Sequence, residues 1–247
     1  MRDDLQPAQA SVDWAEAQLP TFRKRVDSWL KENVHTVIVE QPANVPNDVV
    51  TFKEKAPLPL AFQVEAGAYI NAIRSSLDIL AATLANRHCQ SLIDDAYFPV
   101  ASSQGAFVTG NYKGSKFVRA LPVRERNIIE MLNPYKEGNN LLYGLHLLDI
   151  VRKHQRLLAV EVRPYHLMIS GWGDTTKAFT PVATGWMRSG DDEAVIGLIA
   201  KDVREKPKIK LAMQVSLSET AYHPRGEVVA ALHQFANLAK ALIRAFE

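Results

Sequence analysis

The chain has 247 residues, of which 47% are hydrophobic and 23% are charged, and its formal net charge is +2. This composition is typical of a globular protein and excludes a disordered chain, a collagen-like repeat and a disulfide-stabilised scaffold. The single cysteine, Cys89, excludes an intrachain disulfide and a cysteine-based zinc site. Residues 1–20 have no apolar signal segment, and no stretch approaches the ~18 apolar residues of a membrane span, so we expect a soluble, cytoplasmic protein with no membrane partner.

The first third of the chain predicts a helix, a hairpin and a long central helix. Apolar residues three to five positions apart predict a helix over residues 13–33, which either begins near Pro20 or kinks there. Residues 34–40 and 49–53 are rich in valine and are joined by turn-forming residues, which predicts a β-hairpin. The segment from about 58 to 87 is apolar nearly all round and has no internal proline after its start, which indicates a central helix covered by others.

The middle of the chain is expected to contain a loop region followed by two helices. Three glycines in a polar stretch make residues 94–124 loop-rich. A short helix is predicted between residues 122 and 134. Asn139 or Asn140 can cap a longer helix that covers about residues 139–158.

The hydrophobic period changes from helical to alternating near Ala159, which predicts three or four antiparallel strands and then a last helix. The strands are expected at residues 160–163, 165–170, 193–201 and 208–218, separated by turns at 171–173, 190–192 and 205–207. Pro224 and Gly226 introduce the final helix, which has one apolar face.

The order of these elements predicts an α+β fold. We expect one domain over residues 1–247, in which residues 56–160 form a helical core and the central helix packs on the helix at about 139–158. The strands of residues 160–218, joined by the hairpin, are expected to form one antiparallel sheet. Residues 224–247 are expected to form the terminal helix.

The sequence contains no recognisable nucleotide-binding or metal-binding motif. Gly105 and Gly110 have the spacing of a phosphate-binding loop, but Asn111 and Tyr112 stand where lysine and serine or threonine are required. No two histidines are three or four residues apart, so no helical face carries a histidine pair that could hold a metal. We therefore predict no metal and no cofactor.

A basic segment with interleaved aromatic residues is a weak candidate for binding nucleic acid. Only Glu125 is acidic in this segment, whereas five residues are basic: Lys113, Lys116, Arg119, Arg124 and Arg126. Basic side chains beside aromatic rings can hold single-stranded nucleic acid. The favoured interpretation is a solvated loop whose aromatic residues anchor it to the core.

A polar stripe on the central helix is the stronger signal. Asn71, Arg74 and Asp78 are at positions i, i+3 and i+7, and Arg74 and Asp78 can pair. The helix at 139–158 carries Asp149 and Lys153, also four residues apart, together with Arg152 and His154. Charges on inner helices need partners, so we predict that Arg74 or Asp78 contacts Asp149, Lys153 or His154. A structural network is favoured over an active site.

These two helices resemble those of a widespread family of bacterial proteins that lacks an established function. The resemblance rests on residues 70–80 and 148–158, on Tyr97-Phe-Pro99 and on Leu132-Asn-Pro-Tyr135. Many members of that family carry an arginine followed after four residues by a histidine, which is similar to the ribonuclease signature of HEPN domains, small helical bundles that dimerise. Such an arginine would hold the scissile phosphate while the histidine moves a proton.

This chain departs from the signature because Ile79 stands at the histidine position. Two hypotheses follow. The favoured one is a non-catalytic binding or interaction module whose buried charges fix the packing of the helices. The alternative is a metal-independent, HEPN-like ribonuclease or its degenerate relative, with Arg74, Asp78 and His154 at the site. The resemblance allows a homodimer and an RNA or protein partner.

Overall fold

The chain forms two compact units, each described by itself. The computed structural model describes residues 2–33, 35–43, 45–110, 112–171, 178–182, 187–188, 193–203, 207–218 and 226–247. The helical unit consists of Met1–Lys24, Leu60–Glu161 and Ser216–Glu247. The β unit consists of Arg25–Pro59 and Val162–Val215. The prediction of a single domain over residues 1–247 stays a prediction.

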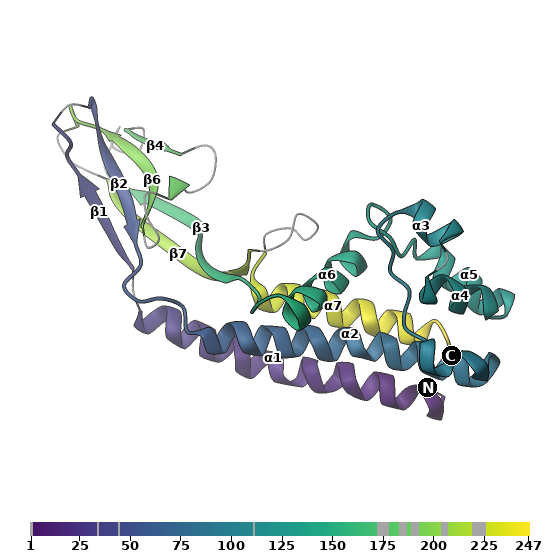
Figure 1. Ribbon diagram of the computed structural model, residues 1–247. Helices are drawn as coiled ribbons and strands as arrows, with labels where there is room; N and C mark the ends of the chain where they lie inside the picture. The colour runs from purple at the N-terminus through teal and green to yellow at the C-terminus, as the bar shows by residue number, and fades with distance from the viewer. Residues whose placement is uncertain are drawn as a thin grey trace. The chain divides into compact units, whose positions relative to one another are not determined.

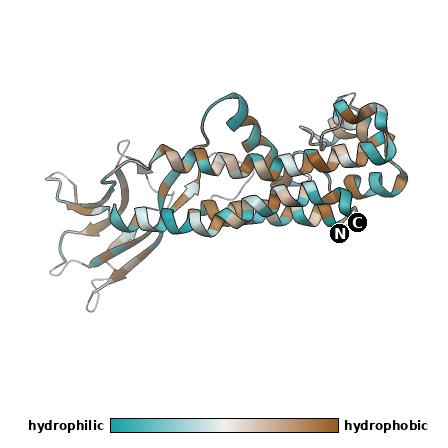
Figure 2. Cartoon of the chain, turned by 90° about the horizontal axis from the view of Figure 1, so that it is seen from below, coloured by the Kyte–Doolittle hydropathy of each residue, from teal (hydrophilic) through white to brown (hydrophobic). Residues whose placement is uncertain are grey.

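The helical unit contains one long helix, α2, at its centre (Figure 1). The helical elements are η1 (Asp3–Leu5), α1 (Gln6–Glu32), α2 (Leu60–His88), η2 (Gln90–Asp95), α3 (Gln104–Thr109), α4 (Lys113–Ala120), α5 (Val123–Met131), α6 (Asn140–His154) and α7 (Val228–Arg244). Hydrophilic and hydrophobic segments alternate along the helices in Figure 2, as expected for helices that bury one face.

α2 is buried along most of its length, which confirms the predicted central helix. Most of its large apolar residues are buried, and Ile73, Leu77 and Leu80 are fully so, whereas Leu60 and Val64 in its first two turns are exposed. The side chain of Arg152 on α6 lies so close to Gly67 that a Cβ there would be 2.9 Å from it, so the glycine permits a close approach of α2 and α6. The predicted packing of these two helices is confirmed. Asn139 is the cap of α6, because its side chain accepts a hydrogen bond from the N–H of Leu142.

α1 begins at Gln6 and runs through Pro20, so the alternative that it begins near Pro20 was wrong. Leu19 before the proline and Phe22 two residues after it are fully buried, and the Phe22 ring lies 5.5 Å from the Tyr69 ring of α2. Pro20 itself is exposed. Burial of the apolar face thus continues past the proline, and water can reach the carbonyl that loses its helical partner.

The predicted loop over residues 94–124 was wrong in part, because it contains α3 and α4. Ser103 caps α3 by accepting a hydrogen bond from the N–H of Ala106. Buried Phe117 and Val118 hold α4 on the unit. Gly114 is required at the start of α4, since a Cβ there would lie 2.7 Å from the Tyr112 ring. The glycines here permit close packing within short helices.

The β unit contains two antiparallel sheets, so the α+β fold is confirmed, whereas the single sheet was wrong. The strands are β1 (Thr36–Glu40), β2 (Asn47–Lys53), β3 (Val160–Ser170), β4 (Phe179–Pro181), β5 (Met187–Arg188), β6 (Glu193–Ala200) and β7 (Lys208–Leu217). β1 and β2 form the predicted antiparallel hairpin, the first sheet has the order β1-β2-β6-β4 with β5 also on β6, and the second is β3-β7.

A shared apolar core explains why the strands separate into two sheets. Phe52, Phe179 and Ile196 of the larger sheet are buried, and apolar residues of β3 and β7 such as Leu167 and Leu211 pack against them. Two sheets that each have one apolar face bury more surface by packing face to face than by joining edge to edge.

The terminal helix α7 is confirmed, and Glu227 caps it by accepting hydrogen bonds from the N–H groups of Val229 and Ala230. Glu227 also forms an ion pair with Arg23 of α1 at 2.8 Å. The predicted turns at 172–173, 190–192 and 205–206, and the predicted start of the helix at Pro224, lie outside the described residues. In the part of the chain that the structure describes, no helix is both long and apolar enough to cross a membrane.

Candidate functional site

The predicted pair of Arg74 and Asp78 is present on α2 and binds the backbone of Phe98. Arg74 is only 3% exposed, and its Nη1 donates a hydrogen bond to Asp78 Oδ1 at 2.7 Å. Its Nη2 donates to the carbonyl oxygen of Phe98 at 2.9 Å, and the N–H of Phe98 donates to Asp78 Oδ1 at 2.9 Å. The two side chains and one backbone residue therefore form a closed ring of hydrogen bonds, here called the Arg74 clamp.

The contact between α2 and α6 is made by Asn71. Its Nδ2 donates to Asp149 Oδ1 at 3.2 Å, and Asp149 is 5% exposed. Asp149 also pairs with Lys153 at 2.6 Å, as their spacing predicted. Among the described residues, no hydrogen bond or ion pair joins Arg74 or Asp78 to Asp149, Lys153 or His154, so that prediction was wrong. The physical reason is that Phe98 supplies the acceptor that Arg74 needs.

His154 is not a hydrogen-bond or ion-pair partner of Arg74. It is the last residue of α6 and is exposed, and it has no hydrogen bond or ion pair within the described ranges. Ile79, which stands at the histidine position of the resemblance, is half-buried on α2. Neither position therefore provides a proton-transferring group to the Arg74 clamp.

His146 is the residue of this region that the sequence reasoning missed. It is half-buried on α6, and burial lowers its pKa from 6.5 to about 4, with a further decrease from the nearby charge of Arg74. Lys153 acts in the same direction, whereas Asp149 and Asp78 oppose it. The imidazole is therefore neutral at pH 7. Its position three residues before Asp149, on the same face of the helix, is the signal that could have identified it.

The basic segment lies largely on α4, and two of its three candidate residues already have partners. Lys113 pairs with Asp95, and Arg119 Nη1 donates to the carbonyl oxygen of Gly110 at 3.1 Å. Lys116 is exposed, and its side chain makes no hydrogen bond or ion pair with another described residue. Lys113, Lys116 and Arg119 are spaced by three residues, so they point to neighbouring parts of one helical face.

Within the described residues, no group of three or more His, Cys, Asp or Glu side chains is arranged to hold a metal ion. Comparison of the chain with protein-family models, with curated proteins and with solved structures finds no match. The family resemblance and the relation to HEPN domains therefore remain proposals that rest on the motifs quoted above.

Removal of the Asp78 carboxylate should destabilise the protein markedly. Asp78→Ala leaves Nη1 of the buried Arg74 guanidinium and the N–H of Phe98 without an acceptor, and breaking a buried pair typically costs 3–5 kcal/mol. Because the Asp78 side chain is 35% exposed, water can compensate in part, and we expect a loss of about 3 kcal/mol in the free energy of unfolding. Denaturant unfolding measures this loss.

The matched control is Asp95→Ala, which removes the partner of Lys113 from an ion pair whose side chains are 61% and 53% exposed. We expect this variant to melt at the temperature of the wild-type protein. Equal melting temperatures of Asp78→Ala and wild type would contradict a structural role of the Arg74 clamp.

The neutral His146 should make stability depend on pH. Its pKa is about 4 in the folded protein and near 6.5 in the unfolded chain, so between these values the unfolded state binds the additional proton. Folding stability is therefore lost as the pH falls from 6.5 to 4. We expect the wild type to lose roughly 2 kcal/mol more than His146→Gln over this window, after allowance for partial exposure. Denaturant titrations at pH 7 and pH 4 measure the difference, and parallel pH profiles of the two proteins would refute it.

Proposed function

We propose that the protein is a non-catalytic binding or interaction module in which the Arg74 clamp and the α2–α6 contact hold the helical unit together. The observation that carries the proposal is the state of Arg74, which is 3% exposed and has both terminal nitrogens bound within the protein. A homodimer, an RNA or protein partner and a cytoplasmic location, all expected from the sequence, stay predictions.

A phosphate clamp requires guanidinium N–H groups that face the ligand. In Arg74, Nη1 and Nη2 are bound to Asp78 and Phe98, and Nε is buried without a partner among the described residues. A phosphate that took the place of the present partners of Nη1 or Nη2 would displace Asp78 or expose the Phe98 carbonyl. Either change leaves a buried polar group without a partner, which costs free energy. This supports a structural role for Arg74.

A metal-independent ribonuclease is the second candidate, and His146 is the observation that favours it. His146 lies close enough to Arg74, Asp78 and Asp149 for their charges to shift its pKa. A neutral imidazole can accept a proton at pH 7. Its pKa of about 4 nevertheless makes it a weak base, because acid–base catalysis is most efficient when the pKa lies near the working pH.

The purified protein should not cleave RNA. We expect no turnover above background for the wild type, Arg74→Ala or His146→Ala when single-stranded RNA is incubated in chelator, because the arginine is occupied and the imidazole is a weak base. Gel analysis of the RNA measures this. Cleavage by the wild type that disappears in both variants would make the ribonuclease the better account, and cleavage that appears only in Ile79→His would identify a degenerate enzyme.

Lys116 and Arg119 should give at most weak RNA binding. Contacts of exposed cations with phosphates release counterions, so the affinity should fall roughly tenfold when salt rises from 50 to 200 mM. Fluorescence anisotropy with a labelled single-stranded RNA measures the affinity. We expect Lys116→Ala to weaken binding and Arg244→Ala, an exposed arginine on α7, to leave it unchanged. Binding that is insensitive to salt or to Lys116→Ala would exclude this surface.

A further inference from the structure

A groove in the helical unit lies outside the α2–α6 cluster. It is bounded by α3, α4, α5 and the turn after α5, and has a volume of about 300 Å³. A second hollow of about 420 Å³ adjoins it and shares Gln104, Asn133 and Tyr135 with it. Together they are called the Tyr135 groove here. A cavity of this size is typical of sites for small molecules.

The wall that carries Tyr135 is held in place by its backbone. Asn133 follows the end of α5 in the left-handed region, with φ 48°, a conformation that asparagine tolerates at helix ends. Ala101 then pairs with both sides of the turn, since its N–H donates to Pro134 and its carbonyl oxygen accepts from Lys136. Glu137 also has a positive φ, 71°, which is uncommon for this residue and accompanies functional sites more often than other positions.

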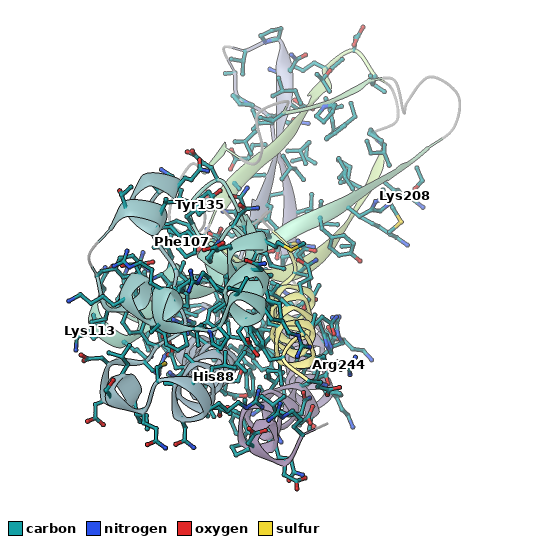
Figure 3. The ribbon with its side chains drawn as sticks, turned by 90° about the vertical axis from the view of Figure 1, so that its right-hand side faces the viewer. His88, Phe107, Lys113, Tyr135, Lys208 and Arg244 are labelled. Carbon is teal, nitrogen blue, oxygen red and sulfur yellow. The ribbon has the colours of Figure 1, made fainter. Side chains whose placement is uncertain are left out.

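One side of the groove is apolar and aromatic. The rings of Phe107 and Tyr135 lie 6.0 Å apart at an angle of 39°, and Figure 3 shows them next to each other. Val108 is 62% exposed beside them, and Val118 of α4 also lines the groove. An apolar side chain of a ligand would bury this surface.

The other feature of the groove is a pair of opposite charges that do not bind each other. Arg119 and Glu130 both line it, yet they form no ion pair. The Glu130 carboxylate has no hydrogen bond or ion pair with any described residue, and the Arg119 side chain uses only Nη1, for the Gly110 carbonyl. A cation and an anion that share one cavity and remain apart leave space for a ligand that carries both charges.

We propose that the Tyr135 groove binds a small zwitterion with an apolar side chain, of the class of a free α-amino acid. Its carboxylate would accept hydrogen bonds from Arg119, its ammonium group would donate to Glu130, and its side chain would lie against Phe107 and Val108. This inference goes beyond the proposed function and involves neither Arg74 nor His146. The cleavage assay tests Arg74 and His146, so either proposal can fail while the other stands.

The charges of the groove disfavour other classes of small ligand. A nucleotide brings two or more negative charges, which Glu130 would repel, and a fatty acid has no cation for Glu130. A ligand whose only charge is an ammonium group would be repelled by Arg119. Only a ligand with one charge of each sign can pair with both Arg119 and Glu130.

The test uses L-phenylalanine and two analogues that each lack one charge. Isothermal titration of the whole chain should give a dissociation constant of about 1 mM or lower for L-phenylalanine. N-acetyl-L-phenylalanine lacks the ammonium group and L-phenylalaninamide lacks the carboxylate. Each should bind at least tenfold more weakly, because each loses a charge-assisted hydrogen bond.

Variants of the two charged residues assign the contacts. Glu130→Gln should weaken binding of L-phenylalanine tenfold or more. N-acetyl-L-phenylalanine should bind this variant and the wild type with equal affinity. Arg119→Gln should likewise weaken binding of L-phenylalanine tenfold or more, but here L-phenylalaninamide should bind the variant and the wild type equally well. Arg124→Gln is the matched control, because Arg124 is exposed on α5 and does not line the groove.

Both charged residues are exposed, so the variants should melt like the wild type, which a thermal scan checks. The proposal is overturned if L-phenylalanine shows no binding at a concentration 20 times the expected dissociation constant, or if all three compounds bind with equal affinity. Binding of only one analogue would assign the groove to a peptide end rather than to a free amino acid. Displacement of the amino acid by a nucleotide would assign it to an anionic ligand.

Discussion

The buried guanidinium of Arg74 is the constraint on which the arrangement of the helical unit depends. A guanidinium that is removed from water needs acceptors for its N–H groups, and Asp78, one turn along α2, supplies one of them. The Phe98 carbonyl supplies the other, and the Phe98 N–H returns a hydrogen bond to Asp78. Since the Phe98 side chain is also fully buried, the chain after η2 has a fixed position on α2.

That fixed position continues into the Tyr135 groove. Three residues after Phe98, Ala101 pairs with Pro134 and Lys136 on either side of Tyr135. One wall of the groove is therefore connected to α2 through a short run of backbone that has little freedom. Such a wall is prepared for a ligand before the ligand arrives, which lowers the entropic cost of binding.

The contact between α2 and α6 also contains a buried charge that needs partners, the carboxylate of Asp149. Asp149 is compensated on its own helix by Lys153, and the connection to α2 is an amide, Asn71. An amide donates a hydrogen bond without adding another charge to be desolvated. His146 stays neutral for the same reason, since burial and the charge of Arg74 both disfavour its protonated form. The buried carboxylate of Asp149 at this contact is therefore paired on its own helix, with Lys153 at 2.6 Å and Arg152 at 3.9 Å.

The sequence predicted what depends on spacing along one element and missed what depends on neighbours far along the chain. The central helix and the Arg74–Asp78 and Asp149–Lys153 pairs follow from helical periodicity, and all three are present. No periodicity identifies the Phe98 carbonyl as a partner of Arg74.

The errors have physical causes of the same kind. α3 has six residues and α4 has eight, too few for a repeating apolar pattern to be distinguished from a loop with buried anchors. Alternation located β3, β6 and β7, although it divided β3 into two strands and missed the short β4 and β5. It cannot tell whether two strands share a sheet or face each other across a core. The separate sheet of β3 and β7 therefore could not be predicted.

Exposure decides which of the two charged regions can bind a ligand. A buried charge must find its partners within the protein, as the two terminal nitrogens of Arg74 do, and a ligand that took their place would break those bonds. Arg119 and Glu130 are exposed, so water satisfies their free groups at little cost, and a ligand can replace that water. The charged stripe on an apolar helix, which is the most conspicuous feature of the sequence, is thus the region least available for binding. The Tyr135 groove is harder to identify in the sequence, because Arg119 and Glu130 lie on different short helices. It is nevertheless the region in which a cationic and an anionic side chain are both accessible to a ligand.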